Sequence, residues 1–189
     1  MYKNINEFEQ LFFSNCDGCE QMCCTGSKFS LAPLVLEDFE RVYKYFPILF
    51  GTVNDEFKAF IPLNNGKESC PYLDSNLKCS IYESRPPACR LYPISPYFDQ
   101  LFVDTSCKAV GFEGDFLVSP KYLSNSFYDK RLENFVPKLE ETKDFLELIK
   151  NDLEHIVTIH DIKLYKYNAN LNNTPIQLHL QSLSNLDKF

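Results

Sequence analysis

The sequence predicts an α+β fold, with a small cysteine-rich core of short strands and loops and a helical C-terminal appendage. All eight cysteines lie within the first 107 of the 189 residues. Around them, short apolar runs alternate with turn residues, a pattern typical of strands and loops. The residues that follow carry longer apolar stripes at helical spacing. We therefore expect a cysteine-rich domain over residues 1–115 and a mainly helical part over residues 116–189 that packs on it.

The composition is that of a globular protein, with 44% hydrophobic and 24% charged residues. The formal net charge of −7 argues against nucleic acid as a partner, because phosphate backbones require clustered Lys and Arg. No apolar run reaches the length of a membrane span. The first ten residues are mixed and acidic, without the apolar stretch of a secretory signal. We therefore expect the protein to be in the cytoplasm, where thiols stay reduced. Of the partner classes considered, another protein is the one that the composition does not argue against.

The first half of the chain is expected to alternate between helices and strands. Ile5, Phe8 and Leu11 recur at helical spacing and predict a helix over residues 1–15. A strand over residues 28–31 should precede a helix whose apolar positions run from Leu36 to Phe46. Residues 57–63 read as a strand that ends in a turn.

The second set of cysteines begins on a predicted hairpin. Residues 70–73 and 77–80 flank a turn of Asp, Ser and Asn, so each arm of the hairpin carries one cysteine. Ser84 is expected to cap a single helical turn that contains Cys89. A strand over residues 101–106 then leads to Cys107.

The remainder is expected to be largely helical. Residues 120–135 carry a helical pattern, and the stripe from Leu139 to Ile156 predicts a second helix whose apolar face is core or a partner surface. Residues 157–167 alternate like one strand. Residues 177–181 predict a short strand or helix, and weak order is expected toward the end.

Dense thiols in a protein form disulfides, bind metal or catalyse redox reactions. Reduced thiols disfavour disulfides, and the Cys-x2-Cys pair follows a predicted helix instead of lying between a strand and a helix, which disfavours a thioredoxin-like dithiol. Metal binding remains, because thiolates are soft ligands for zinc and iron–sulfur clusters. The candidate ligands are all eight cysteines: Cys16, Cys19, Cys23, Cys24, Cys70, Cys79, Cys89 and Cys107.

The spacing of these cysteines favours an iron–sulfur cluster, expected to be [4Fe–4S], with zinc as the alternative. Zinc sites usually combine two Cys-x2-Cys pairs, but the four later cysteines lie far apart in the sequence. Clusters are commonly held by cysteine alone, and all three histidines follow the last cysteine. Cys23 and Cys24 are adjacent, so their side chains should diverge. We therefore expect the two sulfurs to serve different sites, or only one of them to be a ligand.

Two arginines flank Cys89 in the sequence. Arg85 and Arg90 could offset the negative charge of a thiolate-bound cluster and so act as cofactor-binding residues. They could equally pair with surface acids. Tyr82 and Tyr92 could exclude water from the site or pack as ordinary core residues.

Several separated motifs carry a resemblance to a known family. Cys16-x2-Cys19-x3-Cys23-Cys24 is followed by Cys70-Pro71-Tyr72-Leu73, Cys79-Ser80-Ile81-Tyr82, Arg85-Pro86 and Cys89-Arg90-Leu91-Tyr92-Pro93. In this order they resemble the YkgJ-like CxxCxxCC cysteine-cluster family, described as zinc- or iron-chelating, over about residues 14–110.

The resemblance implies metal chelation by the cysteine-rich region. The flagellin lysine methylase is similar in its cysteine module, which implies an iron–sulfur cluster and offers protein lysine methylation as a further alternative. Residues 108–189 contain no Gly-rich nucleotide-binding loop after a strand, so no S-adenosylmethionine site can be assigned to them.

Overall fold

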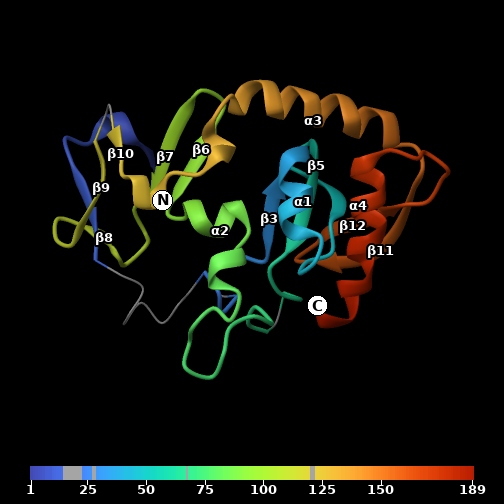
Figure 1. Ribbon diagram of the computed structural model, residues 1–189, viewed down its shortest axis with the longest axis horizontal. Helices are drawn as coiled ribbons and strands as arrows, with labels where there is room; N and C mark the ends of the chain where they lie inside the picture. The colour runs from blue at the N-terminus through green and yellow to red at the C-terminus, as the bar shows by residue number, and fades with distance from the viewer. Residues whose placement is uncertain (15–22, 27–28, 67, 120–121) are drawn as a thin grey trace. The chain divides into compact units, whose positions relative to one another are not determined.

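The computed structural model describes residues 1–14, 23–26, 29–66, 68–119 and 122–189. The chain divides into two compact units, each built from two segments that are distant in sequence. Unit 1 comprises Met1–Gln21 and Pro87–Val136, and unit 2 comprises Met22–Pro86 and Pro137–Phe189. Both helices and short strands are present, which confirms the predicted α+β class (Figure 1).

Unit 1 contains two small antiparallel sheets. One has the strand order β1-β7-β6 and the other β10-β9-β2-β8. Its elements are β1 (Tyr2–Asn4), β2 (Leu11–Phe13), α2 (Pro87–Leu91), β6 (Ile94–Tyr97), β7 (Gln100–Asp104), β8 (Val110–Gly111), β9 (Asp115–Ser119) and β10 (Tyr122–Leu123). Ile5, Leu11, Ile94, Val103, Leu117 and Val118 form its buried core. Strands of two to five residues bury little apolar surface alone, so their shared core stabilises them.

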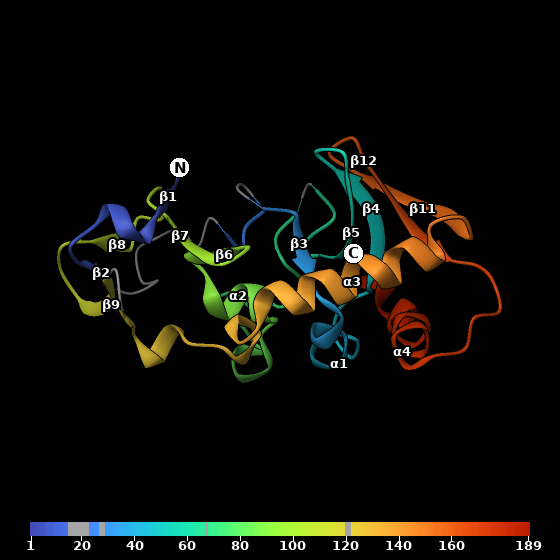
Figure 2. The ribbon, with the colours of Figure 1, turned by 90° about the horizontal axis from the view of Figure 1, so that it is seen from above.

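Unit 2 contains a five-stranded antiparallel sheet of order β11-β12-β4-β5-β3. Its elements are β3 (Leu31–Leu34), α1 (Phe39–Val42), β4 (Leu49–Val53), β5 (Glu56–Pro62), most of α3 (Phe135–Ile149), β11 (Leu153–Ile159), β12 (Ile162–Tyr167) and α4 (Thr174–Ser182). Helices α1, α3 and α4 lie on one face of this sheet (Figure 2). Phe50 of β4 is fully buried there, against Phe145 of α3 and His179 of α4.

Several local predictions are confirmed. β5 coincides with the strand predicted over residues 57–63, and β7 with that over residues 101–106. The strand predicted over residues 28–31 lies slightly later, as β3, and includes Pro33. Because β3 is an edge strand, a proline in it need not remove a ladder hydrogen bond.

Two predicted helices are wrong. The described part of residues 1–15 forms β1, a 3₁₀ turn and β2, because β1 pairs with β7 and β2 with β8 and β9. The described part of residues 120–135 forms β10 and two 3₁₀ turns. The side chains of Ser124 and Asp129 accept backbone N–H groups two residues ahead, a local bond that competes with a continuous helix.

Three further elements are shorter than the sequence predicted. The helix expected over residues 36–46 is a 3₁₀ turn, Leu36–Asp38, and one turn of α1. The helix expected to reach Ile156 ends at Ile149, and β11 begins at Leu153. The single strand expected over residues 157–167 is the β11–β12 hairpin, which turns at His160 and Asp161. Their φ angles of 46° and 66° suit a two-residue turn.

The end of the chain is ordered around a buried histidine. Residues 177–181 belong to α4, which continues into a 3₁₀ helix, Leu183–Lys188. His179 is fully buried, and its Nδ1–H donates to the carbonyl of Ile48 at 2.8 Å. Its Nε2 accepts the backbone N–H of Tyr167 at 3.1 Å. Burial, aided by the charge of Lys166 and opposed by the Ile48 carbonyl, lowers the pKa of His179 to about 4.

Acid should therefore weaken the fold through His179. Between its unfolded pKa of 6.5 and its folded pKa of about 4, only the unfolded chain binds a proton here. This contribution is fully retained above pH 6.5 and is lost as pH falls to about 4. We expect urea unfolding to show a loss of about 3 kcal/mol from this group across that window. A free energy of unfolding with the same pH dependence in the wild type and in His179→Gln would contradict this role.

Candidate metal centre

The hairpin predicted over residues 70–79 is present in unit 2. Leu73 forms an antiparallel bridge with Cys79, and the N–H of Asp74 donates to the carbonyl of Lys78 at 2.8 Å. The Asp74 carboxylate accepts the N–H groups of Asn76 and Lys78, which closes the turn. This hairpin places Cys70 and Cys79 on neighbouring arms, both half-buried.

A second pair of cysteines lies beside the hairpin. The backbone N–H of Cys70 donates to the carbonyl of Cys24 at 2.7 Å, which joins two segments separated by more than forty residues. The sulfurs of Cys23 and Cys24 lie 3.8 Å apart. The expectation that these sulfurs diverge is therefore wrong. It assumed a strand or a helix, whereas the two residues lie in a turn.

The separation of these two sulfurs fits chelation of a single metal ion. Tetrahedral zinc–thiolate bonds of about 2.3 Å place two sulfurs about 3.8 Å apart. In a [4Fe–4S] cluster each of the four thiolates binds a different iron, which places the sulfurs farther apart. Cys23 and Cys24 can thus bind one tetrahedral ion together with little rearrangement.

The thiols of this group also interact electrostatically. A hydrogen bond with Cys24, together with burial, raises the pKa of the Cys23 thiol. Burial, and to a smaller extent the charges of Cys79 and Cys23, raises the pKa of the Cys70 thiol. Neighbouring thiolates repel one another, and a bound cation would relieve this repulsion. Metal binding should therefore release protons from these cysteines.

Of the other four cysteines, two belong to unit 1 and two lie outside the described residues. Cys16 and Cys19 lie outside the part of the chain that the structure describes. Cys89 lies on α2 and Cys107 follows β7, both in unit 1. None of the six described cysteines forms a disulfide. Among the described residues, no three His, Cys, Asp or Glu side chains already lie close enough together to hold an ion.

The two arginines predicted to tune the site have well-defined contacts. Arg85 stacks on the ring of Tyr82, with its guanidinium carbon 3.6 Å from the ring centroid, and its Nε–H donates to the Tyr82 carbonyl. Arg90 forms an ion pair with the buried Asp129, with Nε and Oδ2 separated by 3.4 Å. Tyr92 donates its hydroxyl to the buried Asp104. The ion pair of Arg90 with Asp129 and the hydrogen bond of Tyr92 to Asp104 join residues of unit 1.

The three histidines are bonded to groups other than the cysteines. His155 bonds to Thr158 at 3.0 Å, and His160 bonds to the hydroxyl of Ser30 at 2.9 Å. Both ring nitrogens of His179 bond to backbone groups. None of these hydrogen bonds joins a histidine to a cysteine.

A shallow cavity of about 320 Å³ lies on the sheet of unit 2. Its lining is apolar apart from Ser30, Lys58 and His160, and comprises in addition Phe29, Leu31, Pro33, Val53, Phe60, Ile159 and Ile162. This lining carries no thiol and no carboxylate. The cavity is therefore a different feature from the cysteine group.

Comparison with known families identifies the cysteine-rich stretch. A family model named CxxCxxCC, with the description "Putative zinc- or iron-chelating domain", matches residues 15–110, just over half of the chain. The chain belongs to the CxxCxxCC family. No curated protein and no solved structure matches it.

The CxxCxxCC region contains all eight cysteines and the whole 70–79 hairpin. The chain is accordingly a metal-binding protein of the zinc- or iron-chelating kind, and the resemblance seen in the sequence is confirmed. No helix in the described residues is long and apolar enough to cross a membrane.

Sequence reasoning missed the role of one residue inside the CxxCxxCC region. Tyr72 lies between the two hairpin cysteines, and its side chain contacts Tyr45 and Phe46 in the rest of unit 2. Its motif, Cys-Pro-Tyr-Leu, was visible in the sequence. The partners that give Tyr72 its role, at residues 45, 46 and 188, lie far from it in the sequence.

Proposed function

We propose that the chain holds an iron–sulfur cluster through cysteine thiolates alone, in a sensing, electron-transfer or accessory role within a reducing compartment such as the cytoplasm. The observation that carries this proposal is the composition of the donor set. Cys23, Cys24, Cys70 and Cys79 gather in one unit, while each histidine is bonded elsewhere. A cluster of [4Fe–4S] type would take one ligand from the Cys23–Cys24 pair, or require the two sulfurs to move apart.

A second candidate is a structural or storage zinc site. The specific observation in its favour is the 3.8 Å separation of the Cys23 and Cys24 sulfurs, which suits two ligands on one tetrahedral ion. Bound zinc would neutralise the mutually repelling thiolates and fasten residues 23–26 to the hairpin, which stabilises the fold.

Metal analysis distinguishes the two candidates. We expect protein purified without oxygen to be brown, with iron and acid-labile sulfide in comparable amounts. A matched preparation from zinc-rich, iron-limited cells serves as the control for adventitious loading. A colourless protein with stoichiometric zinc in both preparations would replace the cluster with the zinc site. A protein without either metal would overturn both candidates.

A further inference from the structure

Tyr72 links the two arms of the cysteine hairpin through its backbone. Its backbone N–H favours the thiolate of Cys70 and so opposes the rise in the pKa of that thiol. Its carbonyl accepts both the N–H of Ser80 at 2.8 Å and the hydroxyl of Ser80 at 3.1 Å. Tyr72 lies two residues after Cys70, and Ser80 follows Cys79 directly. The bonds between Tyr72 and Ser80 therefore hold together the two arms that carry these cysteines.

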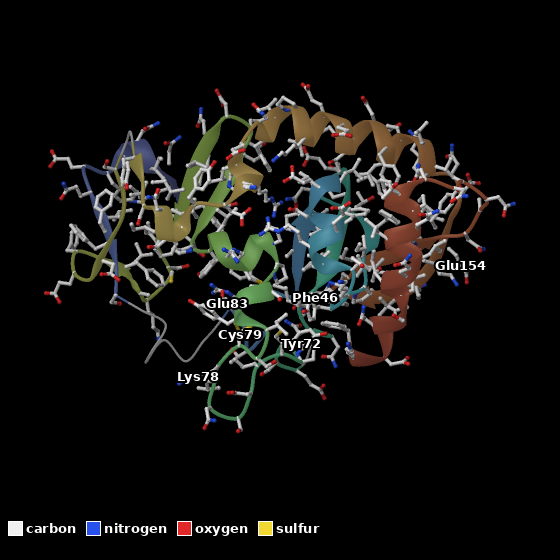
Figure 3. The ribbon with its side chains drawn as sticks, in the orientation of Figure 1. Phe46, Tyr72, Lys78, Cys79, Glu83 and Glu154 are labelled. Carbon is white, nitrogen blue, oxygen red and sulfur yellow. The ribbon has the colours of Figure 1, made fainter. Side chains whose placement is uncertain are left out.

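The side chain of Tyr72 fastens the hairpin to the segment between α1 and β4. The hydroxyl donates to the carbonyl of Tyr45 at 2.6 Å. The ring packs edge-on against Tyr45, with centroids 5.9 Å apart, and lies 5.2 Å from the ring of the buried Phe46. Figure 3 shows Tyr72 beside Phe46, with Cys79 on the same hairpin.

The C-terminal residues complete this anchor from the other side. Lys188 donates to the Tyr72 hydroxyl at 3.2 Å, and the ring of Phe189 lies 5.5 Å from that of Phe46. Lys188 also donates to the side chain of Asn185, whose amide donates to the carbonyl of Tyr43 at 2.9 Å. Asn185 is buried, so this end of the chain is itself held against the same segment.

We propose that Tyr72 is a positioning residue for metal binding, and that residues 185–189 support it from outside the CxxCxxCC region. The inference rests on the proposed function, because it concerns the thiols of the same site. A hairpin fixed in advance presents Cys70 and Cys79 to the metal with little ordering left to occur on binding. A loosened hairpin must be ordered at that moment, which weakens affinity.

The test uses Tyr72→Phe, which keeps the ring and removes the hydroxyl bonds to Tyr45 and Lys188. Cd²⁺ is titrated into reduced, metal-free full-length protein, and its thiolate absorption reports the affinity. We expect Tyr72→Phe to bind Cd²⁺ about fivefold more weakly, because this fold-change corresponds to the net free energy of one hydrogen bond. Lys188→Met should weaken binding in the same direction and by less, since its ammonium group is exposed.

Lys150→Met is the matched control, because Lys150 is also an exposed lysine of unit 2 but bonds to Glu147 on α3. It should leave the Cd²⁺ affinity unchanged. The alkylation rate of Cys79 in the metal-free protein is a second measurement, and it should rise in Tyr72→Phe if the hairpin loosens.

The possible outcomes are distinct. Wild-type affinity in Tyr72→Phe, with only a lower thermal midpoint, would reduce Tyr72 to a structural role and overturn the inference. A wild-type protein that binds no Cd²⁺ would instead defeat the proposed function itself.

Discussion

Cys79→Ser is expected to produce protein that has lost most of its metal and much of its stability. A serine hydroxyl is a hard and weakly acidic ligand, so it does not replace a thiolate on zinc or iron. A structural thiolate-bound metal contributes on the order of 10 kcal/mol to folding. Loss of one ligand should therefore lower the thermal midpoint of the purified protein well beyond the range of an ordinary surface substitution. Metal analysis together with thermal unfolding measures both effects.

Asn76→Ser is the control for this substitution, because it alters an exposed residue of the same hairpin turn. It should retain both the metal and the thermal midpoint. Cys89→Ser extends the test to the thiols of unit 1, which the sequence also predicts to be ligands. Full metal content in Cys79→Ser would remove Cys79 from the ligand set, and the same result for Cys89→Ser would remove Cys89.

His179→Ala should cause the largest loss of stability among substitutions outside the cysteines. It removes a fully buried ring that packs on Phe50 at 4.8 Å between centroids. It also leaves the carbonyl of Ile48 and the N–H of Tyr167 without these buried partners. The cavity and the lost hydrogen bonds together predict a decrease of about 3–5 kcal/mol in the free energy of unfolding.

Chemical denaturation measures this loss at pH 7.5, because the ring of His179 is neutral there in both the folded and the unfolded protein. His155→Ala is the comparison, because His155 is exposed on β11. It should change the free energy of unfolding by no more than about 0.5 kcal/mol. Equal stabilities for the two variants would show that the His179 bonds do not hold α4 against the sheet.

The sequence predicted elements that depend on local chemistry. The turn residues Asp74 to Asn76 were enough to predict the cysteine hairpin, and the short, mainly apolar run that ends at a proline was enough to predict β5. The β11–β12 turn was missed because its two positive-φ positions carry His160 and Asp161 in place of the usual Asn and Gly.

Errors arose where distant partners decide the structure. Ile5 lies in a 3₁₀ turn and Leu11 in β2, because β1 pairs with β7 and β2 pairs with β9. The candidate ligand set of eight cysteines could be listed from the sequence. The prediction that the sulfurs of Cys23 and Cys24 diverge was wrong, because the two residues lie in a turn. The anchoring of Tyr72 depends on Tyr45 and Phe46, which precede it in the sequence, and on Lys188, which follows it by 116 positions.

The pairing of the strands has a consequence for any attempt to excise the cysteine-rich stretch. Within residues 15–110, β4 would lose its neighbour β12, and Phe50 would be left bare of Phe145 and His179. β7 would likewise lose β1. A fragment of residues 15–110 would therefore expose unpaired strand edges at β4 and β7 and the aromatic ring of Phe50. We therefore expect the fragment of residues 15–110 to be much less stable than the longer chain.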